Sequence, residues 1–233
     1  MLPYLEANLS FMTVPLEEYN DSRLDQLLIG LVARKMSRAV GKTTALSGYE
    51  GLVDLSEQVV KGYDAQGQQR VIGTMLRSLI PAPVLWSIRT FVRPARLILE
   101  WNAWFASHMF AWLVGPCEQR EVEVPDAQGQ PRMQRSGIHI KKCRYLEQSG
   151  CVGMCINMCK LPTQEFFAQE FGFPLTLTPN FEDLSCEMVF GQPAPPLQEE
   201  AIYHQPCLAT QCSVAQPKAP ACPKVREGAF TDS

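Results

Sequence analysis

Sulfur is concentrated in one short stretch of this sequence. Cys143, Cys151, Cys155 and Cys159 fall within residues 143–159, the last three at intervals of four residues. Cysteine thiolates are preferred ligands for zinc and for iron, alone or in iron–sulfur clusters. The chain has nine cysteines, and an odd number does not favour a disulfide framework. The stretch therefore predicts a metal site on these four cysteines, with buried structural thiols as the alternative.

The spacing of the cysteines restricts how such a site can form. On a straight helix, Cys151 and Cys159 would lie about 12 Å apart along the axis, which is too far for one compact centre. Gly150 and Gly153 allow the chain to wrap, so Cys151 is expected in a loop before the helix. The reserve ligands are Cys186, Cys207 and Cys212, with Cys222 as the weakest candidate and Cys117 as a packed thiol.

His139 is the candidate catalytic residue, as a proton donor or as an additional ligand. It precedes Cys143 by four residues, in a segment with a strand-like pattern. The alternative is an ordinary strand histidine whose hydrogen bonds are satisfied nearby. The chain has three histidines in all, so a histidine-rich non-haem iron site is poorly supplied.

The N-terminal half of the sequence has the periodicity of helices. Ser22 and Asp25 form a capping box for a helix over residues 22–40, which carries leucines at helical spacing and ends in basic residues. Two more helices are predicted over residues 52–59 and 71–79, with a turn at 64–67 between them and prolines after the second.

Residues 84–114 form the most apolar segment, and Pro94 is expected in the first turn of a helix that runs to residue 115. All four tryptophans lie here: Trp86, Trp101, Trp104 and Trp112. Arg89, Arg93 and Arg96 recur at helical spacing and predict a basic face. This pattern fits a helix at a membrane surface or beside an apolar cleft, or else a buried core helix with one cationic edge. The uncharged run over 101–117 falls short of the roughly 20 residues of a transmembrane helix.

The C-terminal half has a different character. Residues 118–137 are polar and predict turns, whereas 138–145, 175–178 and 186–190 are predicted strands. Helices are expected in the cysteine stretch and over 163–171. The prediction is an α+β fold in which a helical portion, 1–116, packs on a cysteine-bearing portion, 117–197, followed by a proline-rich extended tail, 198–233.

Composition excludes several classes of function. A formal net charge of −3 gives no general attraction to nucleic acid. The segment Gly41–Thr44 imitates the end of a phosphate-binding loop, but the leading glycine is missing, so no nucleotide site is expected. The first residues show neither a signal peptide nor a transit peptide pattern.

The run Cys143–Gln164, CRYLEQSGCVGMCINMCKLPTQ, resembles the dwarf-twenty-seven family of beta-carotene isomerases. The resemblance continues through PNFED at 179–183, SC at 185–186 and FG at 190–191, and it includes QPC at 205–207. It is strong over 138–196 and looser over the N-terminal helices.

This resemblance implies a non-haem iron enzyme, mononuclear or with an iron–sulfur cluster, that interconverts all-trans- and 9-cis-beta-carotene on the way to strigolactones. It implies a carotenoid as substrate and peripheral contact with a membrane. The expected location is the plastid stroma or thylakoid surface in a plant or alga, or the cytoplasm or thylakoid surface in a cyanobacterium. The rival hypotheses are a non-catalytic metal-binding or redox-sensing protein and a carotenoid carrier.

Overall fold

The computed structural model describes residues 19–91, 95–126 and 128–205. The predictions on Arg93, Pro94, Cys207, Cys212 and Cys222 fall outside the described residues.

Three helices form one side of the molecule: α1 (Arg23–Val40), α2 (Gly48–Gly62) and α3 (Ala65–Leu79). The predicted capping box of α1 is confirmed, because the Ser22 hydroxyl accepts from the Asp25 backbone N–H and the Asp25 carboxylate accepts from the Ser22 N–H. The predicted turn at 64–67 is instead the start of α3.

The apolar segment contains three helices, and the helix predicted to run to residue 115 is divided at Phe110. The three helices are α4 (Ala82–Phe91), α5 (Arg96–Met109) and α6 (Ala111–Val114). The predicted basic face is therefore divided, since Arg89 belongs to α4 and Arg96 begins α5. The chain also bends by 89° between α3 and α4. Among the described helices, none is long and apolar enough to cross a membrane alone, and α3 with α4 would do so only as a bent pair.

The sheet has four antiparallel strands in the order β1-β2-β4-β3. Their bounds are β1 (Cys117–Pro125), β2 (Pro131–Ile140), β3 (Leu175–Pro179) and β4 (Cys186–Phe190). The expectation of turns over 118–137 is confirmed only between the strands, where the Gly129 N–H donates to the carbonyl oxygen of Asp126, and was wrong for the rest, which forms β1 and most of β2. Charged side chains can occupy the exposed side of a two-sided strand without breaking its ladder, which is why polarity misled there.

The predicted strand over 138–145 ends earlier, at Ile140. Residues from Cys143 onward cap and form α7 (Arg144–Ser149). A nearly continuous helical stretch follows, with two π-helical parts: α8 (Val152–Met154), η1 (Cys155–Lys160), α9 (Leu161–Phe166) and η2 (Phe167–Phe171). Two 3-10 turns, η3 (Leu197–Glu199) and η4 (Ala201–His204), lie in the C-terminal segment.

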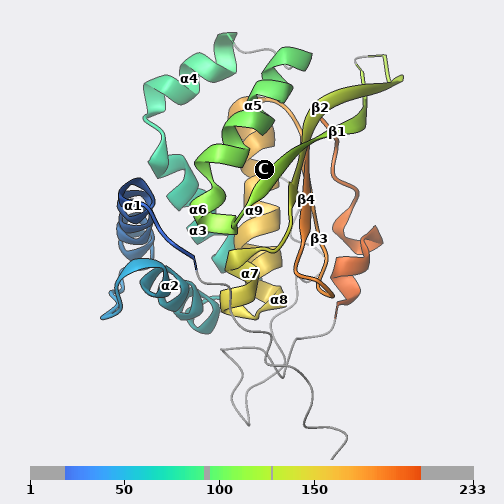
Figure 1. The fold of residues 1–233 in the computed structure, drawn as a ribbon. Coiled ribbons are helices and arrows are strands. Elements are labelled where there is room, and N and C mark those ends of the chain that lie inside the picture. The colour runs from blue at the N-terminus through green and yellow to red at the C-terminus, as the bar shows by residue number, and fades with distance from the viewer. Residues whose placement is uncertain (1–18, 92–94, 127, 206–233) are drawn as a thin grey trace, which may run out of the picture.

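One hydrophobic core joins the two portions of the chain. It includes Leu55 and Val59 from α2, Ile138 from β2 and Phe190 from β4. In Figure 1 the helical stretch labelled α9 stands between α1–α3 on one side and the sheet on the other. The predicted α+β fold is confirmed, while the boundaries at 116 and 197 stay predictions.

A backbone turn at Gly115 brings the end of α6 against the start of the cysteine stretch. Gly115 has φ 90° and ψ −172°, a region open almost only to glycine. A Cβ atom there would lie 2.8 Å from the carbonyl oxygen of Lys142. Gly129 also has positive φ, but a Cβ there would meet nothing within 4 Å.

We expect Gly115→Ala to lower the free energy of unfolding by about 2–3 kcal/mol or more, because strain and a backbone clash combine. Gly129→Ala serves as the matched control and should cost about 1–2 kcal/mol, from strain alone. Urea unfolding of both variants measures this difference. Equal losses would contradict the proposed clash.

Candidate functional site

The cysteine stretch begins where β2 ends. The backbone N–H of Cys143 donates to the carbonyl oxygen of Leu184 at 2.7 Å, which fixes the stretch to the loop before β4. Gly150 ends α7 with φ 55°, in the left-handed conformation. Cys151 is then extended and immediately precedes α8, as predicted, whereas Gly153 lies inside α8.

Cys155 and Cys159 both lie in the π-helical segment η1. A π-helix closes hydrogen bonds between residues five apart, and the N–H of Leu161 donates to the carbonyl oxygen of Ile156 in this way. Pro162 follows directly and has no N–H to donate, so the ordinary helical ladder is already interrupted here. π-helical segments are rare in proteins, and those that are found frequently lie at functional sites.

Four thiols gather in the core around η1. After the larger effect of burial, the charge of Cys143 raises the pKa values of Cys155, Cys159 and Cys186, and Cys155 also senses the latter two, so the four thiols lie within electrostatic range. Cys186 reaches this cluster from β4, although the sequence suggested it only as a reserve ligand. We call these four side chains the thiol cluster.

Cys151, a predicted ligand, is fully buried, and its charge contributes to the raised pKa of Tyr145. Burial is the main cause of that shift, and Cys155 and Cys159 add to it, so the Tyr145 phenol lies within electrostatic range of all three cysteines.

The thiol cluster has the donor chemistry that iron and zinc prefer. Within the part of the chain that the structure describes, however, no three His, Cys, Asp or Glu side chains are placed to hold a metal ion. The side-chain positions therefore do not fit a metal as they stand, although the donor types do. The metal site on Cys143, Cys151, Cys155 and Cys159 stays a prediction.

Burial raises the pKa values of these thiols. The pKa of Cys143 rises to about 11 and that of Cys159 to about 12, chiefly because a thiolate loses hydration in the core. The same cause moves the pKa values of Cys155 and Cys186 well upward. Metal ligation requires thiolates, so a bound cation would have to offset this loss of hydration.

Lys160 introduces a positive charge next to the thiol cluster. It is almost fully buried, and its ammonium forms an ion pair with Glu200 at 2.8 Å. It also donates to the carbonyl oxygen of Leu177 and to Gln164 Oε1, the latter at 3.0 Å. After the dominant effect of burial, its charge lowers the pKa of Cys155. Lys160 thus connects η1 to β3 and to the C-terminal segment.

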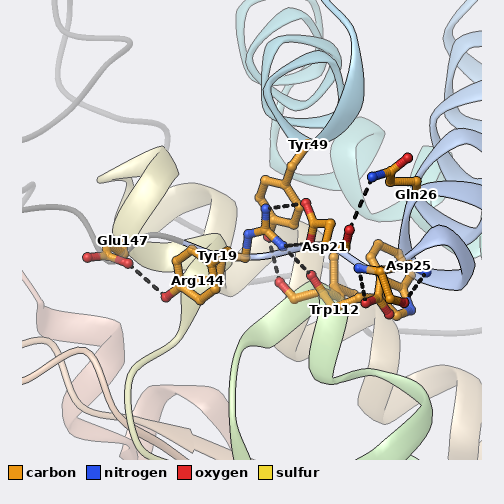
Figure 2. Close-up of polar contacts among 10 residues, drawn as sticks. Tyr19, Asp21, Asp25, Gln26, Tyr49, Trp112, Arg144 and Glu147 are labelled. Carbon is orange, nitrogen blue, oxygen red and sulfur yellow. Dashed lines mark hydrogen bonds and ion pairs between the residues drawn. The ribbon is translucent and has the colours of Figure 1, made fainter.

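Arg144 is the second buried cation, at the other end of the cysteine stretch. Its guanidinium binds both carboxylate oxygens of Asp21, at 2.6 and 2.9 Å, and donates to the carbonyl oxygen of Trp112 at 3.0 Å. Figure 2 shows it between the rings of Tyr19 and Tyr49, with ring centroids 4.4 and 3.8 Å away. The segment before α1 is thereby fastened to the residue that follows Cys143.

His139 lies apart from the thiol cluster. Its neighbours Ile138 and Ile140 are buried in the core, so strand alternation turns His139 toward the opposite face of the sheet. There Nδ1 lies 2.5 Å from Glu187 Oε1, and Arg120 lies 3.6 Å from the same oxygen. The geometry is that of a strand histidine with satisfied hydrogen bonding. It gives His139 no contact with the cysteines.

Sequence reasoning missed Tyr145, Arg144 and Lys160, because a side chain's burial cannot be read from its type. A usable signal was position, since each cation directly follows a cysteine of the stretch.

Cys117 donates to the carbonyl oxygen of Gly115 at 3.2 Å, and burial raises its pKa to about 12. That geometry agrees with the packed thiol expected there.

Comparison with known proteins places the site in a family. The C-terminal domain of D27-like beta-carotene isomerases matches residues 112–199, which contain the thiol cluster. A chloroplastic beta-carotene isomerase D27 of Medicago truncatula is 38% identical over 203 residues, covering 83% of this chain and 79% of the relative. Its namesake in Arabidopsis thaliana is 35% identical over 190 residues, covering 81% and 70%. No solved structure matches the chain.

Fold and relatives together define an α+β isomerase whose cysteine-bearing half carries the family's domain. The chain belongs to the D27-like family of beta-carotene isomerases.

We expect Lys160→Met to destabilise the protein by about 3–5 kcal/mol, because Glu200 would remain in a largely buried place without its cation. Glu200→Leu should also cost several kcal/mol, because it leaves the Lys160 ammonium buried without a carboxylate partner. The double variant should lose less than the two single losses combined, which urea unfolding of all three variants measures. Additive losses would show that the pair is not coupled.

Arg144→Lys should cost about 2–4 kcal/mol although the charge is kept, because lysine cannot bind Asp21 through two parallel hydrogen bonds or stack on two rings. The exposed Arg38 provides the control, and Arg38→Lys should leave the unfolding midpoint within experimental error. A loss at Arg144 no larger than at Arg38 would rule out this role of the guanidinium.

Proposed function

We propose that this protein is a carotenoid cis–trans isomerase that interconverts all-trans- and 9-cis-beta-carotene. The observation that carries the proposal is the 38% identity to the Medicago truncatula enzyme over most of both chains. The plastid is the proposed location, since both relatives are described as chloroplastic, and a role in strigolactone synthesis is proposed with it.

Rotation about a carbon–carbon double bond requires that bond to lose bond order for a moment. Protonation, electron transfer or transient nucleophilic addition to the polyene each achieves this. The reaction involves no net oxidation, so it needs no nicotinamide or nucleotide. The thiols of the cluster and the phenol of Tyr145 are buried groups that bear exchangeable protons, and the phenol lies within electrostatic range of Cys155 and Cys159.

We further propose that the active protein carries iron on thiols of the cluster, together with Cys151. Iron on thiolates supplies one-electron or Lewis-acid chemistry. The support is the donor chemistry of the four thiols and the nearby positive charge of Lys160, which partly offsets the cost of forming thiolates. The side chains would have to draw together for this, because they do not converge in the described structure.

The substrate has consequences for where the enzyme works. Beta-carotene is a hydrocarbon without polar groups and dissolves in lipid rather than in water. We therefore propose that the protein takes up its substrate in peripheral contact with a membrane.

We expect Cys155→Ser to lower both the iron content and the isomerase rate, by about tenfold or more, because one soft ligand is replaced by a poor one. The protein is purified anaerobically, iron and sulfide are quantified, and all-trans-beta-carotene in detergent micelles is followed by chromatography of its isomers. Cys117→Ser is the matched control and should retain both properties, because this thiol packs against the Gly115 carbonyl and senses Cys143 but none of the cysteines of η1.

Unchanged iron and an unchanged rate in Cys155→Ser would refute the iron proposal. Iron without any change in carotene would favour another carotenoid substrate or a metal-sensing role. Pigment that binds without changing its geometry would favour a carrier.

A further inference from the structure

Helix α5 buries its smaller side chains and exposes its largest apolar ones, which is the opposite of what is expected for a helix in water. The side chains that it buries are small or polar for the most part, among them Ala103 and Ala106, and they lie against β2. Leu97, Trp101 and Trp104 recur at helical spacing on the other side and are exposed. Burial of apolar area would favour the opposite arrangement, so this outer side is adapted to something other than water.

Helix α4 continues the same feature. Leu85 is its one buried residue, whereas Val84, Trp86 and Phe91 are exposed. Trp86 and Phe91 contact each other edge to face, with centroids 6.0 Å apart. Figure 1 shows α4 and α5 at the same end of the molecule, away from α7 and α8.

Six side chains of α4 and α5 make up what we call the aromatic face: Val84, Trp86, Phe91, Leu97, Trp101 and Trp104, each 46–75% exposed. They are half of the twelve exposed large hydrophobic side chains among the described residues. Single exposed apolar residues are ordinary on soluble proteins, but such a concentration on consecutive helices marks an interaction surface.

The charge around the aromatic face is positive. Residues 77–110 contain four arginines and one glutamate, Glu100, which pairs with Arg96; with the neighbouring Glu170 included, the net charge is +2 in a chain whose overall charge is −3. Arg77 and Arg89 both pair with Glu170, which is 2% exposed, so two cations share one buried carboxylate. Both arginines remain about half exposed and can meet further anions.

A second copy of the chain is a poor occupant for this surface. In a twofold dimer the same patch faces itself, so the arginine excess of one copy would meet that of the other. Tryptophan and arginine side by side are instead the combination found at the boundary between lipid headgroups and acyl chains, where the ring enters the apolar layer and the cation meets phosphate.

We propose that the aromatic face of α4 and α5 docks on a bilayer that contains anionic lipid. The inference rests on the proposed function for its purpose, which is to bring the enzyme to a lipid-dissolved substrate. Its physical basis, the exposed tryptophans and the positive charge, does not depend on that function.

The test is sedimentation of the full-length protein with carotene-free vesicles of phosphatidylcholine, with and without phosphatidylglycerol. Wild type should bind the anionic vesicles more tightly, and added salt should weaken that binding. The double variant Trp101→Ser, Trp104→Ser should bind about tenfold or more weakly, because two large rings no longer enter lipid. Leu24→Ser with Leu27→Ser, two exposed leucines of α1, is the matched control and should bind as wild type does.

Tryptophan fluorescence gives a second readout. Brominated lipid should quench Trp86, Trp101 and Trp104, whereas Trp112 is buried and should stay protected. Circular dichroism establishes that the variants are folded. Equal vesicle binding by wild type and the double variant would overturn the proposal, as would an absence of binding. It would also be overturned by a dimer in solution that the double variant abolishes.

Failure here is separable from failure of the proposed function. Vesicle binding is measured without carotene, and turnover of carotene in detergent micelles is measured without a bilayer. A protein that isomerises micellar carotene but ignores vesicles would leave the enzyme intact and refute the docking surface.

Discussion

Burying a cation in a protein core is costly unless a carboxylate pairs with it. Two cations flank the cysteine stretch, Arg144 directly after Cys143 and Lys160 directly after Cys159. Asp21, from the segment before α1, neutralises the first, and Glu200, from the segment after β4, neutralises the second. Partners for one short stretch therefore come from opposite ends of the described chain. These two pairs hold the segment before α1 and the C-terminal segment against the cysteine stretch.

The same requirement shapes the surroundings of the sulfur atoms. Burial alone keeps the thiols protonated, and each thiolate would raise the pKa of the next. Lys160 works against both effects from within η1, and it is held in place by three oxygen partners. The π-helical segment and Pro162 leave the local backbone less regular than an α-helix. Such a backbone is compatible with a site in which the distances between thiols change when a ligand binds.

The sheet and α5 divide the molecule's apolar surface into two parts. One part is the core, where alanines of α5 allow a close approach to β2. The other is the aromatic face, where the largest side chains of the same helix point outward. A helix that exposes tryptophans and buries alanines gives up stability in water for contact with an apolar partner. The aromatic face and the sulfur-bearing core are therefore parts of one compact scaffold.

The sequence alone determined the elements whose signals are local. The capping box of Ser22 and Asp25, the position of Cys151 before a helix, and the strands over 175–178 and 186–190 all rest on neighbouring residues, and the structure agrees with each. The cysteine run was specific enough to indicate the family as well. The polar composition of 118–137 led to a prediction of turns where strands form. A strand with one exposed side tolerates charged residues, and turns are rich in the same residues.

Only the tertiary structure decided what depends on distant segments. Cys186 joins the thiol cluster because β4 pairs with β2, and His139 leaves it because strand alternation turns it to the other face. The exposure of Trp101 and Trp104 depended on which side of α5 met the sheet, and helical spacing fits a buried or an exposed stripe equally well. Arg144 and Lys160 look in the sequence like any surface cations. Their burial depends on Asp21 and Glu200, which lie 123 and 40 residues away along the chain, and long-range pairing of this kind leaves no local pattern to read.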